Sequence, residues 1–530
     1  MRISALINTL NSASTSAHRA AFGGLMLVAL IIRIAAFQGY LDSDPRDYTV
    51  LADDLAHGTL RIPAYDGAPV FPLRLGVYAP VTALFKVFGL SEVTTVAYPF
   101  LISILGCLLT YALARYLVTP FVGLIALALL SIVPIDIGMA SLLFPDAIAA
   151  FWANLAVAAA LIALRRAGIR QVSVLGLLSG LLFGVSWLCK ESVVYLVPFV
   201  FILVWFCGSK TTKAGRAACF AAIGVGAAAV LIAEMIFYRK LTGDFLFRLH
   251  GTERNYLKSP QFYFDSSSPL YGWKAGGYTK ALLLRLFVSG PRDLIFDRQM
   301  ICLPAAAIIS AIWALKTRQQ KLYLPILWLG SLLLMFNFMS SSFSAYKPLI
   351  LFARYTYPVL VPSLILVGGL LAGLLAGGAG SKIQNGPRIA LIMGICFLGM
   401  SAFVGRKIYT SRPEQIERRV AARLTKDDVI YTDFRSATSL VFFRTGSLEP
   451  ADSKTIPWEG TKLDQIPNGA YVLVEKAKIT SLAVIYKYES PSYVLQPPLN
   501  WKIVQDYTGG GIVSGKRSLK RVPPIAVRGG

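Results

Sequence analysis

The segment "AFGGLMLVALIIRIAAFQGY" (21–40) is followed directly by "LDSDPRDYTVLADDLAHGTL" (41–60), and this junction decides the fold. The first segment is an apolar run long enough to cross a bilayer core of about 30 Å. The second places five aspartates within residues 41–54. A membrane span that opens into an acidic loop predicts a membrane protein with polar chemistry at one face of the bilayer.

The composition excludes an ordinary soluble protein. Hydrophobic residues make up 55% of the 530 residues and charged residues only 15%, and the mean hydropathy is +0.59. The net charge of +24 does not indicate nucleic-acid binding, because the basic residues fall mostly between apolar runs and on the tail. Orientation in the membrane and attraction to anionic lipid explain that charge. The six cysteines form no CxxC pair or Cys/His cluster, so they predict no zinc site.

Apolar windows of about 17 to 22 residues recur along the chain, each long enough to cross a membrane. They predict a mainly α-helical, polytopic membrane protein with about eleven transmembrane helices. The windows lie near residues 20–38, 94–115, 119–137, 146–164, 172–189, 192–207, 217–237, 301–315, 322–338, 356–378 and 388–404.

Basic residues on the short connections predict the orientation, because cytoplasmic loops are enriched in lysine and arginine. The N-terminus is therefore expected in the cytoplasm, and an odd number of spans places the C-terminus in the periplasm of a bacterial inner membrane. A first loop (39–93) and a long loop (238–300) then face outward. The basic segments contain Arg2 and Arg19; Arg165, Arg166 and Arg170; Lys210, Lys213 and Arg216; Lys316, Arg318 and Lys321; and Lys382 and Arg388.

The pattern changes after residue 405. "RPEQIERRVAARL" (412–424) has helical spacing, whereas "DVIYTDF" (428–434), "AYVLVEK" (470–476) and "WKIVQDY" (501–507) are typical of short strands. We therefore predict a transmembrane domain over 1–405 and a soluble periplasmic α/β domain over 406–530. The last residues, "KRSLKRVPPIAVRGG", have no packing pattern and predict a basic, flexible tail.

The acidic loop predicts an extended turn that leads into an amphipathic helix ending at His57 and Gly58. On such a helix Asp44 and Asp47 share a face, and neighbouring carboxylates repel each other unless a metal, a base or a hydroxyl proton links them. The alternative is that Asp42 and Asp44 only cap the helix and interact with its dipole.

Asp44, Asp47 and Tyr48, with Ala52 and Gly58, resemble the first-loop pattern of GT-C membrane glycosyltransferases related to protein O-mannosyltransferases and the lipid A aminoarabinose transferase. The resemblance extends over most of residues 20–405, through "FPLRLGVYAPVTALFKVFGLSE" (71–92), "FPDAIAAFW" (144–152), "GLLFGVSWLCKESVVYLVPF" (180–199) and "FARYTYPVLVP" (352–362).

The resemblance implies a transferase that takes a sugar from a polyprenyl-phosphate donor, with the loop aspartate as general base. Asp44 is the position that matches this base. Pro45 replaces the glutamate that usually follows, so Asp42 and Asp47 remain alternatives. Tyr48 belongs to the same pattern and is expected to contact substrate.

The leaving phosphate needs cations at headgroup depth, where a low dielectric strengthens their field. Lys190 is the first candidate, because a lysine between two apolar helices is costly unless it has a function. A lysine that only pairs with Glu191 is the alternative. Arg354 beside Tyr355 is the second candidate, against a purely interfacial anchor. Arg74 and Arg33 are weaker candidates, and Tyr355 and Glu191 complete the expected substrate-binding residues.

Asp146 begins the fourth window after a proline. It could position the acceptor, share a divalent cation with Asp44, or only stabilise a helix N-terminus. The sequence leaves the metal undecided. Glu234 could join this group or pair with Arg239, and His57 and His250 are expected on the surface.

Two other functions fit parts of the sequence. A ligase that transfers a whole glycan would use His250, Arg254 and Arg292 of the long loop, but it leaves the acidic first loop without a role. A flippase for a lipid-linked sugar would place its ionisable groups near the bilayer midplane, whereas here they gather at the outer rim. We expect the partners to be a lipid-linked sugar donor, membrane lipids, and an envelope glycan, glycolipid or protein acceptor, with no nucleic acid.

Overall fold

The structure of the protein is a computed structural model. It describes residues 9–41, 43–62, 70–206, 211–258, 278–342, 344, 346–349, 351–376, 386–410, 414–449, 453–467, 469–474, 491–492, 502–506 and 525–528. Asp42 lies outside these ranges, so its predicted role as a cap or base is not addressed by the structure.

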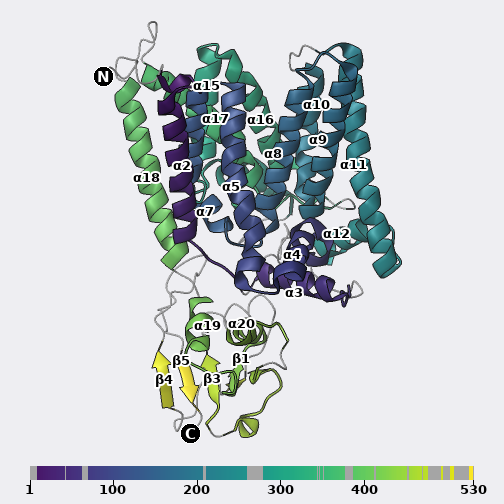
Figure 1. The fold of residues 1–530 in the computed structure, drawn as a ribbon, viewed down its shortest axis with the longest axis vertical. Coiled ribbons are helices and arrows are strands. Elements are labelled where there is room, and N and C mark those ends of the chain that lie inside the picture. The colour runs from purple at the N-terminus through teal and green to yellow at the C-terminus, as the bar shows by residue number, and fades with distance from the viewer. Residues whose placement is uncertain are drawn as a thin grey trace.

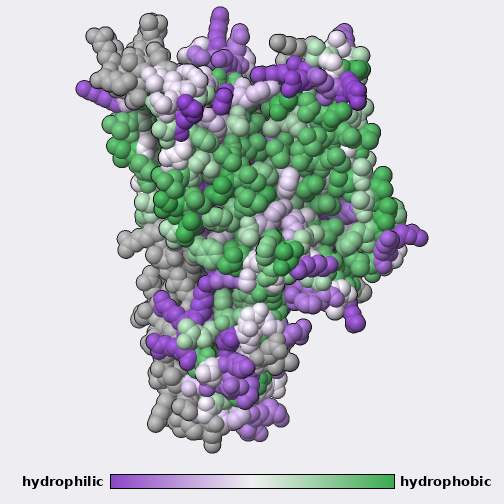
Figure 2. Space-filling view, in the orientation of Figure 1, coloured by the Kyte–Doolittle hydropathy of each residue, from purple (hydrophilic) through white to green (hydrophobic). Residues whose placement is uncertain are grey.

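A bundle of apolar helices forms the larger part of the molecule (Figure 1). Within the described ranges, eight helices are long and apolar enough to cross a membrane. Figure 2 shows a broad hydrophobic band across the visible face of the bundle, with hydrophilic residues at its two ends. The eight spans lie in α2 (Ser16–Ala35), α5 (Glu92–Leu117), α8 (Pro145–Ala163), α9 (Ile169–Cys189), α11 (Lys213–Thr242), α16 (Tyr323–Phe338, preceded by η5, Gln320–Leu322), α17 (Leu360–Ala376, preceded by η6, Tyr357–Val359) and α18 (Gly386–Thr410).

The remaining predicted windows correspond to shorter helices, so the count of eleven spans is not confirmed. The window at 119–137 is divided because Pro134 cannot continue a helix. The shorter elements of this part are α6 (Pro120–Ser131), α7 (Pro134–Met139), η2 (Glu191–Leu196), α10 (Val197–Phe206), α13 (Tyr278–Leu284), the π-helical segment η4 (Arg285–Ser289), α14 (Gly290–Ile295) and α15 (Leu303–Lys316).

Helices α3 (Asp44–His57), α4 (Leu75–Phe88) and α12 (Phe247–Lys258), together with η1 (Phe71–Leu73), lie at the end of the bundle that faces the C-terminal part (Figure 1). The predicted first-loop helix is confirmed, with Pro45 in its first turn. It ends where Gly58 adopts a φ of +73°, a conformation that glycine adopts without steric cost. Asp44 is therefore the first residue of a helix that directly follows the first span.

Small residues bring α9 and α11 close together. A Cβ atom built on Gly180 would lie 2.1 Å from the carbonyl oxygen of Ile223, and one on Gly226 would lie 2.4 Å from that of Leu177. Backbones that approach this closely are typical of helices packed within membranes, where glycine permits extensive van der Waals contact. This packing fixes the C-terminal end of α9, where Lys190 lies.

The C-terminal part contains a five-stranded sheet with strand order β2-β1-β3-β5-β4. β1 pairs in parallel with β2 and β3, and β5 pairs antiparallel with β3 and β4. The elements are α19 (Glu414–Ala421), β1 (Ile430–Thr432), α20 (Phe434–Thr445), β2 (Thr455–Pro457), η8 (Leu463–Gln465), β3 (Tyr471–Val474), β4 (Lys502–Asp506) and β5 (Ile525–Arg528).

Each predicted strand of this part contains a strand of the sheet. The end of the chain differs from the sequence prediction, because residues 525–528 form β5 between β3 and β4 rather than a tail without packing. The segment "IAVR" there supplies the alternating pattern of a strand, although two prolines precede it. The domain boundary at 405/406 stays a prediction; α18 itself continues to Thr410.

The C-terminal part contacts the first loop through α19 and α20. Arg418 donates to Glu92 at the start of α5, with Nη1 3.0 Å from Oε2, and to the carbonyl oxygen of Gln38 at 2.9 Å. Tyr40 stacks on Phe442, with ring centroids 4.3 Å apart. These contacts place α20 beside the chain that leads into α3.

Candidate active site

The first site residue, Asp44, forms an ion pair with a residue 310 positions further along the chain. Nη1 of Arg354 lies 2.9 Å from Oδ2 of Asp44, and the two side chains are 27% and 23% exposed. Burial alone would lower the pKa of Arg354, but Asp44 and Tyr355 raise it above its ordinary value. The turn before α17 therefore places a permanent cation, Arg354, next to the Asp44 carboxylate of the first loop.

A second ion pair lies beside the first. Lys190, the residue that follows the end of α9, donates to Oδ1 of Asp146 in the first turn of α8, and their side chains are 7% and 2% exposed. Nζ of Lys190 also lies 3.8 Å from the centroid of the Tyr355 ring. The alternative interpretation paired Lys190 with Glu191. In the structure Lys190 pairs with Asp146 instead.

Tyr355 and Arg354 join the two pairs into one group. The Arg354 guanidinium lies 5.1 Å from the Tyr355 ring and 4.9 Å from the Phe144 ring, measured to the ring centroids. Oδ2 of Asp146 is buried and accepts no hydrogen bond from the described residues. The group brings together two carboxylates and two cations from residues that are far apart in sequence.

Tyr48 connects this group to a further set of charges. Nη1 of Arg74 donates to the Tyr48 hydroxyl at 2.6 Å, and Nη2 of Arg74 lies 3.8 Å from Oε1 of Glu191. Burial raises the pKa of the Tyr48 phenol, although Arg74 acts in the opposite direction, so the phenol stays neutral and keeps its proton.

Arg248 continues the set on the other side of Glu191. It lies 3.6 Å from Glu191 and donates to Glu234 at 2.6 Å, and Trp187 also donates to Glu234 at 2.9 Å. Glu234 therefore pairs with Arg248 rather than with Arg239. Burial would raise the pKa of Glu191, but Arg74, Arg248 and Lys190 together lower it to about 2.

Three predicted site residues have partners other than the two central ion pairs. Arg33 is fully buried and pairs with Asp136 rather than with the group around Tyr355, because Asp136 on the short helix α7 reaches the last turn of α2. Asp47 accepts a hydrogen bond at 2.6 Å from Arg46, the preceding residue. Glu191 contacts Arg74 and Arg248 and does not pair with Lys190.

Of the residues of the ligase interpretation, His250 and Arg254 both interact with Asp244, whereas Arg292 pairs elsewhere. His250 is exposed and lies 2.7 Å from Asp244, and Arg292 is exposed and pairs with its neighbour Asp293. His57 is also exposed, 3.4 Å from Asp53 of the same helix.

Sequence reasoning missed Arg248, Asp136 and Tyr357. Arg248 belongs to a polar helix, α12, and nothing in the sequence distinguishes it from the surrounding charges. Asp136 did carry a signal, since an ionisable residue inside an apolar window is costly and usually has a partner.

The two carboxylates of the group around Tyr355 are paired with basic side chains of the protein. In the part of the chain that the structure describes, no group of three His, Cys, Asp or Glu side chains comes together as metal ligands. Asp44 and Asp146 each already contact a basic side chain.

Solved structures share the architecture of the chain. The structure of ArnT from Cupriavidus metallidurans in the apo state superposes with a TM-score of 0.52 at 15% sequence identity, over 97% of this chain and 98% of that one. The same protein bound to undecaprenyl phosphate gives 0.52 at 16%, over the same shares. The apo oligosaccharyltransferase of Archaeoglobus fulgidus gives 0.52 at 13%, over 96% of this chain and 75% of that one.

The protein has a GT-C fold. No protein-family model and no curated protein sequence matches the chain. The GT-C fold confirms the predicted architecture of a helical membrane part with an appended small sheet domain. At these levels of identity the fold alone is established, so the roles of individual residues depend on the geometry of the site.

Proposed function

We propose that the protein is an inverting-type glycosyltransferase that moves a sugar from a polyprenyl-phosphate donor to a cell-envelope acceptor at the periplasmic face of the membrane. The acceptor would be a glycolipid, a polysaccharide or a protein. One observation carries the proposal: the ion pairs Asp44–Arg354 and Asp146–Lys190 meet around Tyr355 at the membrane end that carries the first loop.

The chemistry follows from these four charges. Asp44 takes the proton of the acceptor hydroxyl as its oxygen attacks the anomeric carbon. The bond between that carbon and the phosphate oxygen breaks on the opposite face, which inverts the configuration. Arg354 and Lys190 hold the charge that develops on the leaving phosphate, in a setting where fixed cations count for more than in water.

Donor binding also changes the state of the base. A phosphate bound between Arg354 and Lys190 competes with Asp44 for the guanidinium, since both anions fit the same donors. Asp44 is then released from Arg354 and can accept the proton of the acceptor hydroxyl.

Tyr48, Arg74 and Glu191 support this centre. The neutral Tyr48 hydroxyl accepts from Arg74 and keeps its own proton to donate into the site. Glu191 stays anionic between Arg74 and Arg248, so it fixes both arginines and repels a misplaced phosphate.

The location of the C-terminal part agrees with this scheme. It lies at the end of the bundle that carries α3 (Figure 1), and the positive-inside pattern assigns that end to the periplasm. We assign the C-terminal domain to the acceptor side, beside the first loop that it contacts.

Transfer assays on purified protein in proteoliposomes test the proposal. Polyprenyl-phosphate sugars and envelope acceptors would be supplied to wild type, Asp44→Asn and the matched Asp47→Asn on the same helix. We expect transfer by wild type and Asp47→Asn and its loss in a folded Asp44→Asn.

Three outcomes would contradict the proposal. Full transfer by Asp44→Asn would remove Asp44 as the base. Movement of the sugar lipid across the bilayer without transfer would show a flippase. Transfer of whole glycans from a polyprenyl diphosphate, lost in His250→Ala, would show a ligase.

A further inference from the structure

The turn that carries Arg354 and Tyr355 is tied to a buried carboxylate on another element. The hydroxyl of Tyr357, the first residue of η6, donates to Oδ1 of Asp136 on α7. The backbone N–H of Tyr357 donates to the carbonyl oxygen of Arg354 at 3.3 Å. Tyr357 is thus hydrogen-bonded both to Asp136 and to Arg354, the residue that pairs with Asp44.

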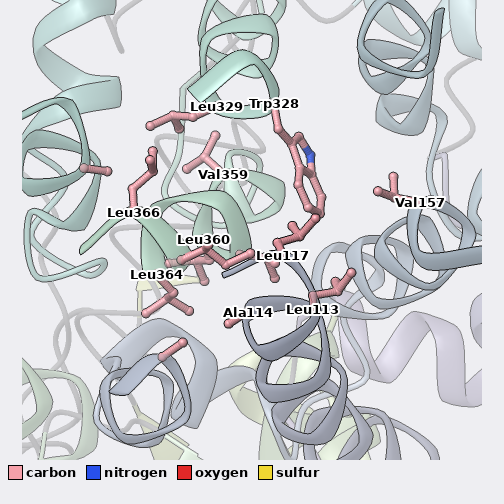
Figure 3. Close-up of a cluster of buried hydrophobic side chains, with 14 of the residues drawn as sticks. Leu113, Ala114, Leu117, Val157, Trp328, Leu329, Val359, Leu360, Leu364 and Leu366 are labelled. Atoms are coloured by element: carbon pink, nitrogen blue, oxygen red, sulfur yellow. The ribbon is translucent and has the colours of Figure 1, made fainter. Parts of the chain in front are cut away.

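The other side of the turn is anchored in the hydrophobic core. Val359 and Leu360 are 0% and 1% exposed, and they pack in the cluster that contains Trp328 and Leu364 (Figure 3). Aliphatic packing resists displacement of η6 but does not orient it, because such contacts are not directional. The Tyr357 hydrogen bond supplies the directional contact.

Asp136 is paired with a cation in this interior. Arg33, from the last turn of α2, donates to Oδ2 of Asp136, and its Nε donates to Ser103 of α5 at 2.7 Å. Both members of the pair are almost completely buried, at 0% and 4% side-chain exposure. An uncompensated charge at this depth would be strongly unfavourable.

We propose that Asp136, neutralised by Arg33, is a positioning residue that holds Tyr357 so that Arg354 and Tyr355 meet Asp44 and Lys190. This inference rests on the proposed function, because the group it positions is the proposed phosphate clamp. The pair thereby links the first span, which precedes the base, to the turn that carries the clamp.

Two double variants separate the hydrogen bond from the ion pair. Arg33→Met/Asp136→Asn and Arg33→Met/Asp136→Leu both lack the buried charges, but only the asparagine keeps an acceptor for the Tyr357 hydroxyl. A cavity of about 30 Å³ lies beside Asp136. Tyr357→Phe removes the hydroxyl alone, and Tyr111→Phe removes a buried hydroxyl that contacts His18 instead.

The first measurement is hydrogen–deuterium exchange of the backbone between Arg354 and Val359, without ligand. We expect faster exchange in Tyr357→Phe and in Arg33→Met/Asp136→Leu, and wild-type protection in Arg33→Met/Asp136→Asn and Tyr111→Phe. Equal protection in all five proteins would overturn the inference, whatever the protein catalyses.

The second measurement is the affinity for undecaprenyl phosphate in detergent, the probe for the clamp. The leucine double variant and Tyr357→Phe should bind it about tenfold more weakly than the asparagine double variant, as expected for the loss of one charge-assisted or polar hydrogen bond. Equal affinities would overturn the inference. Wild-type protein that binds no undecaprenyl phosphate would overturn the proposed function, while the exchange result would still decide whether Asp136 positions the turn.

Discussion

Two aspartate–arginine pairs in this protein have the same chemistry and different surroundings. The Asp44–Arg354 pair lies at the end of the bundle with about a quarter of each side chain exposed, whereas Asp136–Arg33 is almost completely buried. An exposed pair gains little free energy and can exchange partners with an incoming anion, but a buried pair cannot open without leaving charges in a low dielectric. Exposure thus separates a pair that can take part in a reaction from one that fixes the structure.

The largest expected effect is on the exposed pair. Asp44→Asn should lower the rate constant of transfer by about 10² to 10⁴, the range of general acid–base catalysis, while the unfolding midpoint stays near that of wild type. Initial rates at saturating donor and a thermal unfolding scan of the same preparation would measure both. A drop in stability as large as the drop in rate would show that Asp44 behaves like the buried pair.

The buried pair should show the opposite pattern. Arg33→Met leaves Asp136 without its cation and should destabilise the protein by about 3 to 5 kcal/mol, whereas Arg33→Met/Asp136→Asn should recover most of that loss. Arg354→Met should lower the free energy of unfolding by no more than about 1 kcal/mol. Denaturant titration of the three variants in one detergent gives the comparison, and equal costs for Arg33→Met and Arg354→Met would remove the distinction.

Glu191 is less buried than Asp136, and its contribution to stability should depend on pH. Its pKa of about 2 in the folded protein lies below the ordinary 4.5. The unfolded chain therefore binds the proton first, and the stabilisation is complete above pH 4.5 and is lost as the pH falls towards 2. The free energy of unfolding should fall by about 3 kcal/mol when this stabilisation is lost.

The matched variant Glu191→Gln isolates this contribution from other carboxylates. We expect the unfolding midpoint of wild type to fall more steeply between pH 5 and pH 3 than that of the variant. Parallel curves would mean that Arg74 and Arg248 do not act on Glu191 as their positions indicate.

The smallest effect should come from the contact between the two parts of the chain. Arg418 and Glu92 are about a quarter to a third exposed, so Arg418→Ala should cost about 1 kcal/mol or less. Differential scanning calorimetry would detect the shift, with Arg419→Ala on the same helix as control. A loss of several kcal/mol in the free energy of unfolding would show that this contact behaves like the buried Asp136–Arg33 pair.

The sequence predicted the helical class and the first-loop helix, because apolar windows and the glycine at a helix end are local signals. The roles of the site residues stay predictions. The sequence did not predict which charges pair. Lys190 was weighed against Glu191, its neighbour in sequence, and Glu234 against Arg239, whereas the structure pairs them with Asp146 and Arg248. Ion pairs between distant elements depend on how helices cross, and a single sequence does not encode that in any local pattern.

Arg33 and Asp136 show the same limit more clearly. Each is a lone charge in an apolar window, which indicates a partner but not its identity. Asp136 was missed because the window that contains it looked like one continuous span, and Pro134 divides it into α6 and α7. Because of this break, Asp136 lies beside α2 and η6 and contacts both.

The contact between Glu92 and Arg418 has a consequence for biosynthesis. The two residues are 326 positions apart, and the corner they close, at Gly39 with its φ of +74°, belongs to the first loop to leave the membrane. Domains fold as the chain emerges, N-terminal segments first. The rim around the first-loop helix is therefore completed only after the last domain has been translated, so a truncated chain would insert its spans and still lack the finished corner.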